Sequence, residues 1–207
     1  MLTAFTAGLL LITVSELGDK TFFIAVILSL RHSRRLVFIG VMAALAAMTI
    51  LSVLLGRVVS VLPQVYIDYA EIVLFLVFGL KLLYDASQMP VEPSQEEELS
   101  ALEAVKEAEA KSPPQKTPLA ICLEAFTLTF VAEWGDRTQF ATITLAAAHQ
   151  PLGVILGATL GHAICTVIAV KGGGLIASKI SERMITAIGG CLFLVFSAIA
   201  FAESLGV

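Results

Sequence analysis

Residues 15–21 read SELGDKT, and residues 132–138 read AEWGDRT. Each heptapeptide contains Glu-x-Gly-Asp followed by a basic residue and a threonine, and the second begins 117 positions after the first. The pentapeptide LFLVF occurs at 74–78 and again at 192–196, which is 118 positions later. The spacing between the copies thus shifts by one residue over most of the chain. This pattern predicts two copies of one structural unit.

The composition is typical of a protein solvated by lipid. Apolar residues make up 57% of the 207 residues and charged residues 14%, and the mean hydropathy is +0.91. A soluble domain has about half apolar and about a quarter charged residues, so an ordinary globular enzyme is excluded. A net charge of -4 without a long basic stretch excludes a nucleic-acid-binding protein. Cys122, Cys165 and Cys191 lie in apolar runs without metal-type spacing, so we expect small core residues rather than a disulfide or zinc site.

Six segments have the roughly 20 mostly apolar residues that a membrane-spanning helix needs. Residues 1–7 lack the basic start of a secretory signal, so we expect the first segment to be retained. The fold class predicted is therefore an all-α membrane protein with six transmembrane helices. The predicted spans are residues 2–30, 36–56, 69–88, 118–147, 152–171 and 184–205.

A polar segment separates the third span from the fourth and is rich in Pro, Glu, Lys and Ala. It predicts a short amphipathic helix over 94–111, where Ser94 and Glu97 have capping-box spacing. Its composition alone favours a tether without chemistry. The predicted domains are residues 1–88, the first three-helix membrane repeat, residues 89–117, the acidic cytoplasmic linker, and residues 118–207, the second three-helix membrane repeat.

Three spans per repeat predict that the two halves cross the membrane in opposite directions. This inverted-topology arrangement is that of many secondary transporters, whose sites lie near the midplane between the repeats. Gly40 and Gly157 lie at equivalent positions near the start of the second span of each half.

Basic residues gather in the loop after the first span, in the linker and in the loop after the fifth span, whereas Arg57 stands alone on the other side. Because Lys and Arg are retained in the cytoplasm, we expect both termini outside and the linker in the cytoplasm.

The acids of the duplicated motif fall near the middle of the first and fourth spans. Each charge there costs about 2.5–3.5 kcal/mol if it faces lipid, so the acids must face protein. A Glu and an Asp three apart on one helix lie about 5–6 Å from each other. If the repeats meet about a twofold axis, four carboxylates converge on one point, and such an oxygen cage suits Mn²⁺, Ca²⁺ or Mg²⁺. The predicted metal ligands are Glu16, Asp19, Glu133 and Asp136, with Thr21 and Thr138 adding hydroxyls.

The same four acids are predicted to couple proton movement. Crowded carboxylates in a low dielectric cannot all stay ionised, so they bind protons when the metal leaves. Gly18 and Gly135 are expected to loosen each motif helix, and spans of almost 30 residues, about 43 Å long, predict a tilt or a break. Lys20 and Arg137 are predicted to pair at i to i+4 with the Glu of their own motif.

Four further residues are weaker candidates with two interpretations each. Ser15 and Gln139 flank the motifs and either offer oxygens or simply pack. His162 in the fifth span fits a satisfied buried histidine more readily than a ligand or a proton relay. Glu124 in the fourth span either lines an access path or lies at the membrane interface.

The two motifs resemble the E-x-G-D-[KR]-[TS] motifs of the Gdt family of manganese/calcium cation:proton exchangers. The resemblance covers the chain except for the linker. It implies a transporter rather than an enzyme, without a cofactor, which exports Mn²⁺, or Ca²⁺ in some members, against inward proton flow. It also implies that the four motif acids bind the metal with help from the two threonines. The N-terminus resembles prokaryotic members, which implies a bacterial-type plasma membrane or, in a cyanobacterium, the thylakoid.

Other functions stay open at this point. A passive divalent-cation channel also uses carboxylate rings, and a non-transporting membrane assembly factor would use the motifs for partner binding only. An intramembrane hydrolase fits less well, because the duplicated basic residue and threonine favour ion binding. The partners expected are a divalent cation, protons and the lipid bilayer, with no nucleic acid, and the chain is a monomer or a homodimer.

Overall fold

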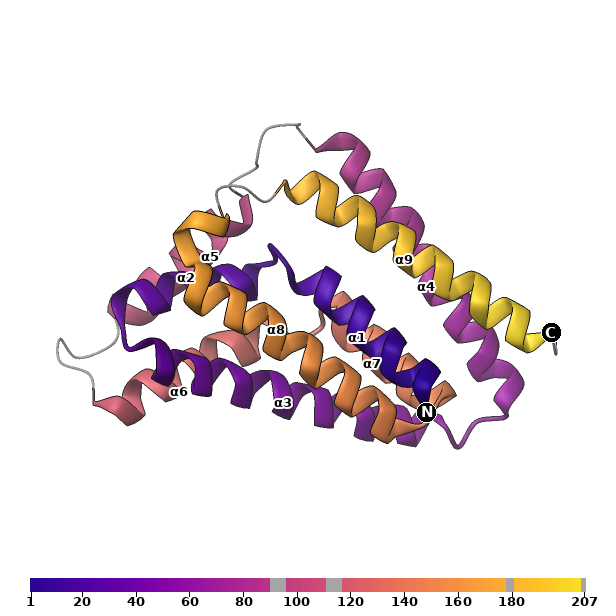
Figure 1. The fold of residues 1–207 in the computed structure, drawn as a ribbon. Helices are drawn as coiled ribbons and strands as arrows, with labels where there is room; N and C mark the ends of the chain where they lie inside the picture. Colours follow the sequence, from indigo (N-terminus) through magenta and orange to yellow (C-terminus); the bar gives the residue numbers. More distant parts are fainter. Residues whose placement is uncertain (90–95, 111–116, 178–180, 206–207) are drawn as a thin grey trace.

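The computed structural model describes residues 1–89, 96–110, 117–177 and 181–205, and in this part of the chain the only regular structure is helical (Figure 1). Short loops join the helices within each half. The helices are α1 (Leu2–Glu16), α2 (Lys20–Arg31), α3 (Arg34–Val59), α4 (Gln64–Gln88), α5 (Glu96–Ala110), α6 (Pro118–Ala132), α7 (Arg137–Ala148), α8 (Pro151–Ala177) and α9 (Glu182–Ser204).

Both motif segments are broken at the glycine of the motif. Gly18 lies between α1 and α2, Gly135 lies between α6 and α7, and each has a φ of 81°. Glycine adopts this left-handed conformation readily because it has no Cβ. The predicted break is confirmed. One expectation is corrected, because Glu16 closes α1 whereas Asp19 precedes α2, so the two acids do not share one continuous helix face.

Helices of one half pack directly against helices of the other. α1 lies against α8, α6 lies against α3, and α4 and α9 run side by side (Figure 1). A Cβ added to Gly157 on α8 would stand 2.2 Å from the carbonyl oxygen of Phe5 on α1. A Cβ on Gly40 of α3 would stand 2.4 Å from the carbonyl oxygen of Cys122 on α6. Phe5 and Cys122 also lie 117 positions apart, so equivalent backbones touch in the two crossings.

The repeated pentapeptide packs against its own copy. Phe75 of α4 and Phe193 of α9 occupy equivalent positions in the two copies, and both side chains are buried. Their ring centroids are 5.6 Å apart in an edge-to-face arrangement, which is favourable for aromatic pairs. This contact joins the last helix of each half.

The helix of the polar segment docks on the membrane helices. α5 lies against α2, and Ala101 and Val105 are fully buried in a core cluster with residues of α2 and α3. Arg31 at the end of α2 forms an ion pair with Glu109. The predicted helix is therefore present, and it packs against the membrane helices instead of only connecting the two halves. Ser94 and its predicted capping box lie outside the described residues.

Three predicted spans have a matching helix that can cross a membrane by length and composition, and a fourth has one if the bent pair of α6 and α7 is a single broken span rather than a re-entrant loop. Within the described residues these are α3, α8 over Pro151–Gly172, α9 over Arg183–Ser204, and the pair α6 and α7, which is bent by 76°. α1 is apolar but shorter, and α4 is not among the candidates. The charged residues of α4 are Asp68, Glu71, Lys81 and Asp85.

The cysteines are free, as expected, but their environments differ. Cys165 is buried and Cys122 is half-buried, whereas Cys191 on α9 is exposed, so the expectation of a core position is wrong for Cys191. Apolar residues on the outside of a membrane protein face lipid, which is as apolar as the protein interior.

An ion pair joins the loop after α7 to α4. Nε2 of His149 lies 3.0 Å from Oε1 of the buried Glu71. The hydrogen bond to this carboxylate raises the pKa of His149 above the ordinary value of 6.5. Because the raised pKa belongs to the folded state, the pair contributes its full stability below pH 6.5 and loses it as the pH rises through the raised value.

We expect Gly157→Ala to destabilise the protein by about 1–3 kcal/mol, because the new methyl group overlaps the α1 backbone. Thermal unfolding in detergent measures this loss. Gly189→Ala is the matched control, because its Cβ would meet no atom closer than 3.7 Å. Equal unfolding temperatures for the two variants would contradict the close crossing of α1 and α8.

We expect His149→Gln to lower the unfolding temperature most below pH 6.5 and progressively less at higher pH, since only the protonated imidazole pairs strongly with Glu71. Unfolding scans between about pH 5.5 and pH 9 would measure the difference from wild type. Glu71→Gln should follow the same profile. A difference that grew with pH would show that the pair does not act in this way.

Candidate functional site

Three acids from the two motifs meet inside the protein. Glu16, Asp19 and Glu133 each offer a carboxylate oxygen, and these oxygens lie within 4.8 Å of one another. Glu16 is 3% exposed and Glu133 is 2% exposed. Oxygens at this separation can share one hard cation after small side-chain movements. The tertiary structure therefore brings together three of the four acids that the sequence singled out.

Asp136 stands beside this group rather than in it. Its Oδ2 accepts hydrogen bonds from the backbone N–H of Thr138, at 3.2 Å, and from the Thr138 hydroxyl, at 3.1 Å. The carboxylate thus caps the N-terminus of α7, where backbone N–H groups lack helical partners. The two motif aspartates therefore have different partners, and only three of the four acids lie in the cluster.

The two threonines make the same contact in each half. Oγ1 of Thr21 donates to Oε2 of Glu16 at 3.1 Å, and Oγ1 of Thr138 lies 3.3 Å from Oε2 of Glu133. The other oxygen, Oε1, of each glutamate is buried and accepts no hydrogen bond from any described residue. Buried polar atoms normally have a partner, so these two equivalent oxygens are points where a cation or a proton would be stabilising.

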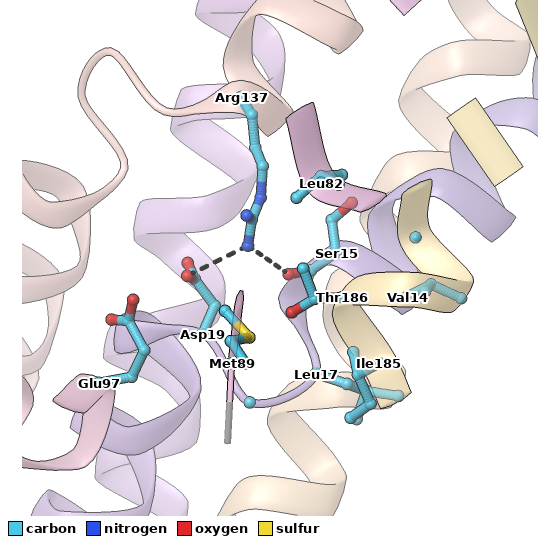
Figure 2. Close-up of a pocket in the computed structure, with 12 residues that line it drawn as sticks. Val14, Ser15, Leu17, Asp19, Leu82, Met89, Glu97, Arg137, Ile185 and Thr186 are labelled. Carbon is cyan, nitrogen blue, oxygen red and sulfur yellow. Dashed lines mark hydrogen bonds and ion pairs between the residues drawn. The ribbon is translucent and has the colours of Figure 1, made fainter. Parts of the chain in front are cut away.

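Arg137 connects the halves instead of pairing within its own motif. Its Nη2 lies 3.4 Å from Oδ1 of Asp19 and donates to the backbone carbonyl of Ser15 at 3.4 Å (Figure 2). The i to i+4 pairs predicted for Lys20 and Arg137 do not form among the described residues. The reason is the glycine break, which ends one helix before the basic residue begins the next.

A cavity of about 60 Å³ lies next to this ion pair. Figure 2 shows Asp19, Arg137 and Glu97 around it, together with apolar side chains of α4 and α9. Glu97 comes from α5, and sequence reasoning did not single it out as a site residue. The available signal was the acidic run that begins this helix. The linker helix thus adds a carboxylate near the acid cluster.

The weaker candidates separate into different environments. Gln139 has both ends engaged, because its Oε1 accepts from the Gly135 N–H at 2.8 Å and its Nε2 lies 3.2 Å from the Met48 sulfur. Ser15 contributes its backbone carbonyl to Arg137. Oε2 of Glu124 lies 3.9 Å from His32 rather than in the acid cluster.

His162 lies next to the cluster. Its Nδ1 is 3.8 Å from Oε1 of Glu16, and both atoms are buried. This distance is too long for a hydrogen bond. The interpretation as a satisfied buried histidine does not account for Nδ1, which has no hydrogen-bond partner among the described residues.

Apolar helices that enclose acids from two repeated motifs define a class of protein, the membrane ion transporters. The family model described as "Divalent cation/proton antiporter GDT1" matches residues 4–90 and 121–206. The chain belongs to this family. It is a multi-pass integral membrane protein with a duplicated domain, and a transporter rather than an enzyme. The family implies a divalent cation and protons as its substrates.

Similar proteins occur in cyanobacteria and plants. The chain is 57% identical over 201 residues to GDT1-like protein sll0615 of Synechocystis sp., covering 97% of this chain and 98% of that protein. It is 44% identical over 214 residues to Protein PAM71-homolog, chloroplastic, of Arabidopsis thaliana, covering 96% of this chain and 59% of that protein. It is 46% identical over 206 residues to GDT1-like protein 3 of Oryza sativa subsp. indica, covering 96% of this chain and 73% of that protein. No solved structure matches the chain.

We expect Glu97→Gln to raise the metal concentration that half-saturates transport by about two- to tenfold, with a smaller change in the maximal rate. The lost charge lowers the local cation concentration at the cavity but leaves the acid cluster intact. Metal-dependent flux in liposomes at low and high salt measures this effect. The exposed Glu98 supplies the control variant Glu98→Gln. Identical salt dependence for Glu97→Gln and wild type would contradict a role in cation capture.

Proposed function

We propose that this protein exports Mn²⁺, with Ca²⁺ as the alternative ion, from the cytoplasm in exchange for protons. The proposed site consists of Glu16, Asp19 and Glu133, with Asp136 beside them. The observation that carries the proposal is the pair of equivalent buried Oε1 atoms of Glu16 and Glu133, which accept no hydrogen bond from any described residue. Either a divalent cation or a proton satisfies such an oxygen, and the two ligands exclude each other.

The charges of the cluster support this exchange. Three carboxylates within 4.8 Å of one another repel strongly in a low dielectric. Arg137 compensates Asp19 and leaves the two glutamates to be neutralised. A divalent cation supplies two positive charges, and two protons supply the same. The departure of one ligand therefore favours the arrival of the other, which is the minimal requirement for coupled antiport.

The proposed architecture is six spans arranged as two inverted three-helix repeats, residues 1–88 and 118–207, joined by the cytoplasmic linker 89–117. The equivalent crossings at Gly40 and Gly157 support it, because each places a helix of one half against the backbone of the other. In this scheme one half rocks against the other at these crossings, which exposes the cluster to each side in turn.

The proposed orientation places both termini outside and the linker in the cytoplasm, as the distribution of Lys and Arg suggests. The membrane proposed is a bacterial-type plasma membrane or the thylakoid, and the cyanobacterial relative supports this. All of the clustered acids come from one chain. A monomer therefore holds the proposed site, and a homodimer would contain two.

We expect Asp19→Asn to reduce metal-triggered proton movement by a factor of about ten or more, because the cluster loses one of its three carboxylate charges. Purified protein in liposomes that contain a pH-sensitive dye receives Mn²⁺, Ca²⁺ or Mg²⁺ under an imposed proton gradient. Wild type and the control Glu98→Gln should move protons when Mn²⁺ is added. Unchanged exchange in folded Asp19→Asn would refute the site.

The same assay separates the alternatives. Metal uptake without proton movement would indicate a passive channel. Absence of any flux from folded wild-type protein would favour an assembly factor, whose motif variants change partner binding only.

A further inference from the structure

The two halves differ at several positions around the acid cluster, and one of these differences adds a histidine. His162 on α8 stands beside Glu16, whereas the equivalent position on α3, 117 residues earlier, is Leu45. The side chain of His162 is 6% exposed. An imidazole nitrogen is thus present in the second half and absent from the equivalent position of the first half.

The geometry between His162 and Glu16 is that of two ligands rather than of a hydrogen-bonded pair. Nδ1 and Oε1 are 3.8 Å apart, and neither has a hydrogen-bond partner among the described residues. An ion at about 2.1–2.3 Å from each atom fits between ligands at this separation. A small cavity of about 10 Å³ lies against both side chains, which is close to the space that one water molecule occupies.

The other polar groups around this cavity are already engaged. Oγ1 of Thr166 donates to the carbonyl of His162 at 2.8 Å, and Sγ of Cys165 lies 3.2 Å from the carbonyl of Thr13. Oγ1 of Thr21 donates to the other oxygen of Glu16. Nδ1 of His162 and Oε1 of Glu16 are therefore buried polar atoms beside this cavity that the described residues leave without a hydrogen bond.

We propose that Nδ1 of His162 is a ligand of the transported ion. Glu16, which belongs to the acid cluster, would bind the same ion through Oε1. The inference rests on the proposed function, because it requires a cation at Glu16. It also specifies the substrate class. Ca²⁺ and Mg²⁺ take oxygen ligands, whereas transition-metal dications also accept an imidazole nitrogen, so His162 favours a transition-metal dication over Ca²⁺ and Mg²⁺.

Pulsed electron paramagnetic resonance tests the ligand directly. Purified protein in detergent binds Mn²⁺, and electron spin echo modulation reports ¹⁴N nuclei bonded to the metal. The chain has three histidines. We expect nitrogen modulation in wild type, its loss in His162→Leu, and its retention in the control His149→Gln. Bound Mn²⁺ without nitrogen modulation in wild type, or modulation that persists in His162→Leu, would overturn the inference.

Ion selectivity provides the second measurement. His162→Gln replaces the nitrogen donor by an amide oxygen and keeps a polar side chain, so it should fold even if the leucine variant does not. We expect the preference for Mn²⁺ over Ca²⁺, taken as the ratio of half-saturating concentrations for exchange, to fall by about tenfold or more. Thr166→Val lines the same cavity and should keep the wild-type ratio. An unchanged ratio in His162→Gln would count against a metal ligand.

The outcomes also separate this inference from the proposed function. If Mn²⁺ binding requires Asp19 but shows no nitrogen ligand, the exchange site stands and only His162 is excluded. If Mn²⁺ binds equally well to Asp19→Asn, the proposed site itself fails. If folded wild-type protein binds no Mn²⁺, both are overturned.

Discussion

A charged side chain in the middle of a bilayer must be enclosed by protein, and this constraint governs the whole structure. Glu16 of the first half is enclosed in part by the second half, because His162, Cys165 and Thr166 of α8 line the same small cavity. The buried positions of Glu16 and Glu133 depend on α1 lying against α8 and on α6 lying against α3.

The glycine of each motif makes the enclosure chemically useful. By ending α1 and α6 inside the protein, Gly18 and Gly135 allow the acids to approach one another from two directions instead of lying along separate helix faces. The break also exposes helix ends, and Asp136 is used to cap one of them. The two motifs are therefore alike in sequence but different in geometry. Asp136 caps a helix in its own half, whereas Asp19 pairs with Arg137 of the other half.

Much of this arrangement could be predicted from residue types and spacing. The repeat, the break at glycine and the grouping of motif acids follow from local sequence and from the cost of charge in lipid. The pairing of Arg137 with Asp19 could not be predicted, because i to i+4 spacing applies only within an unbroken helix. Glu97 was missed for a related reason, since the docking of α5 depends on buried Ala101 and Val105, which look ordinary in the sequence.

The sequence by itself determined that this protein lies in a membrane, that it is duplicated, and that acids recur in two matched motifs. These properties depend on composition and on short sequence motifs, which can be read from the sequence directly. Only the tertiary structure decided which oxygens lie within 4.8 Å of one another, which basic group compensates them, and that His162 stands beside Glu16. The contacts between the two halves join residues more than 100 positions apart, and they arise only when the halves pack at their glycine crossings.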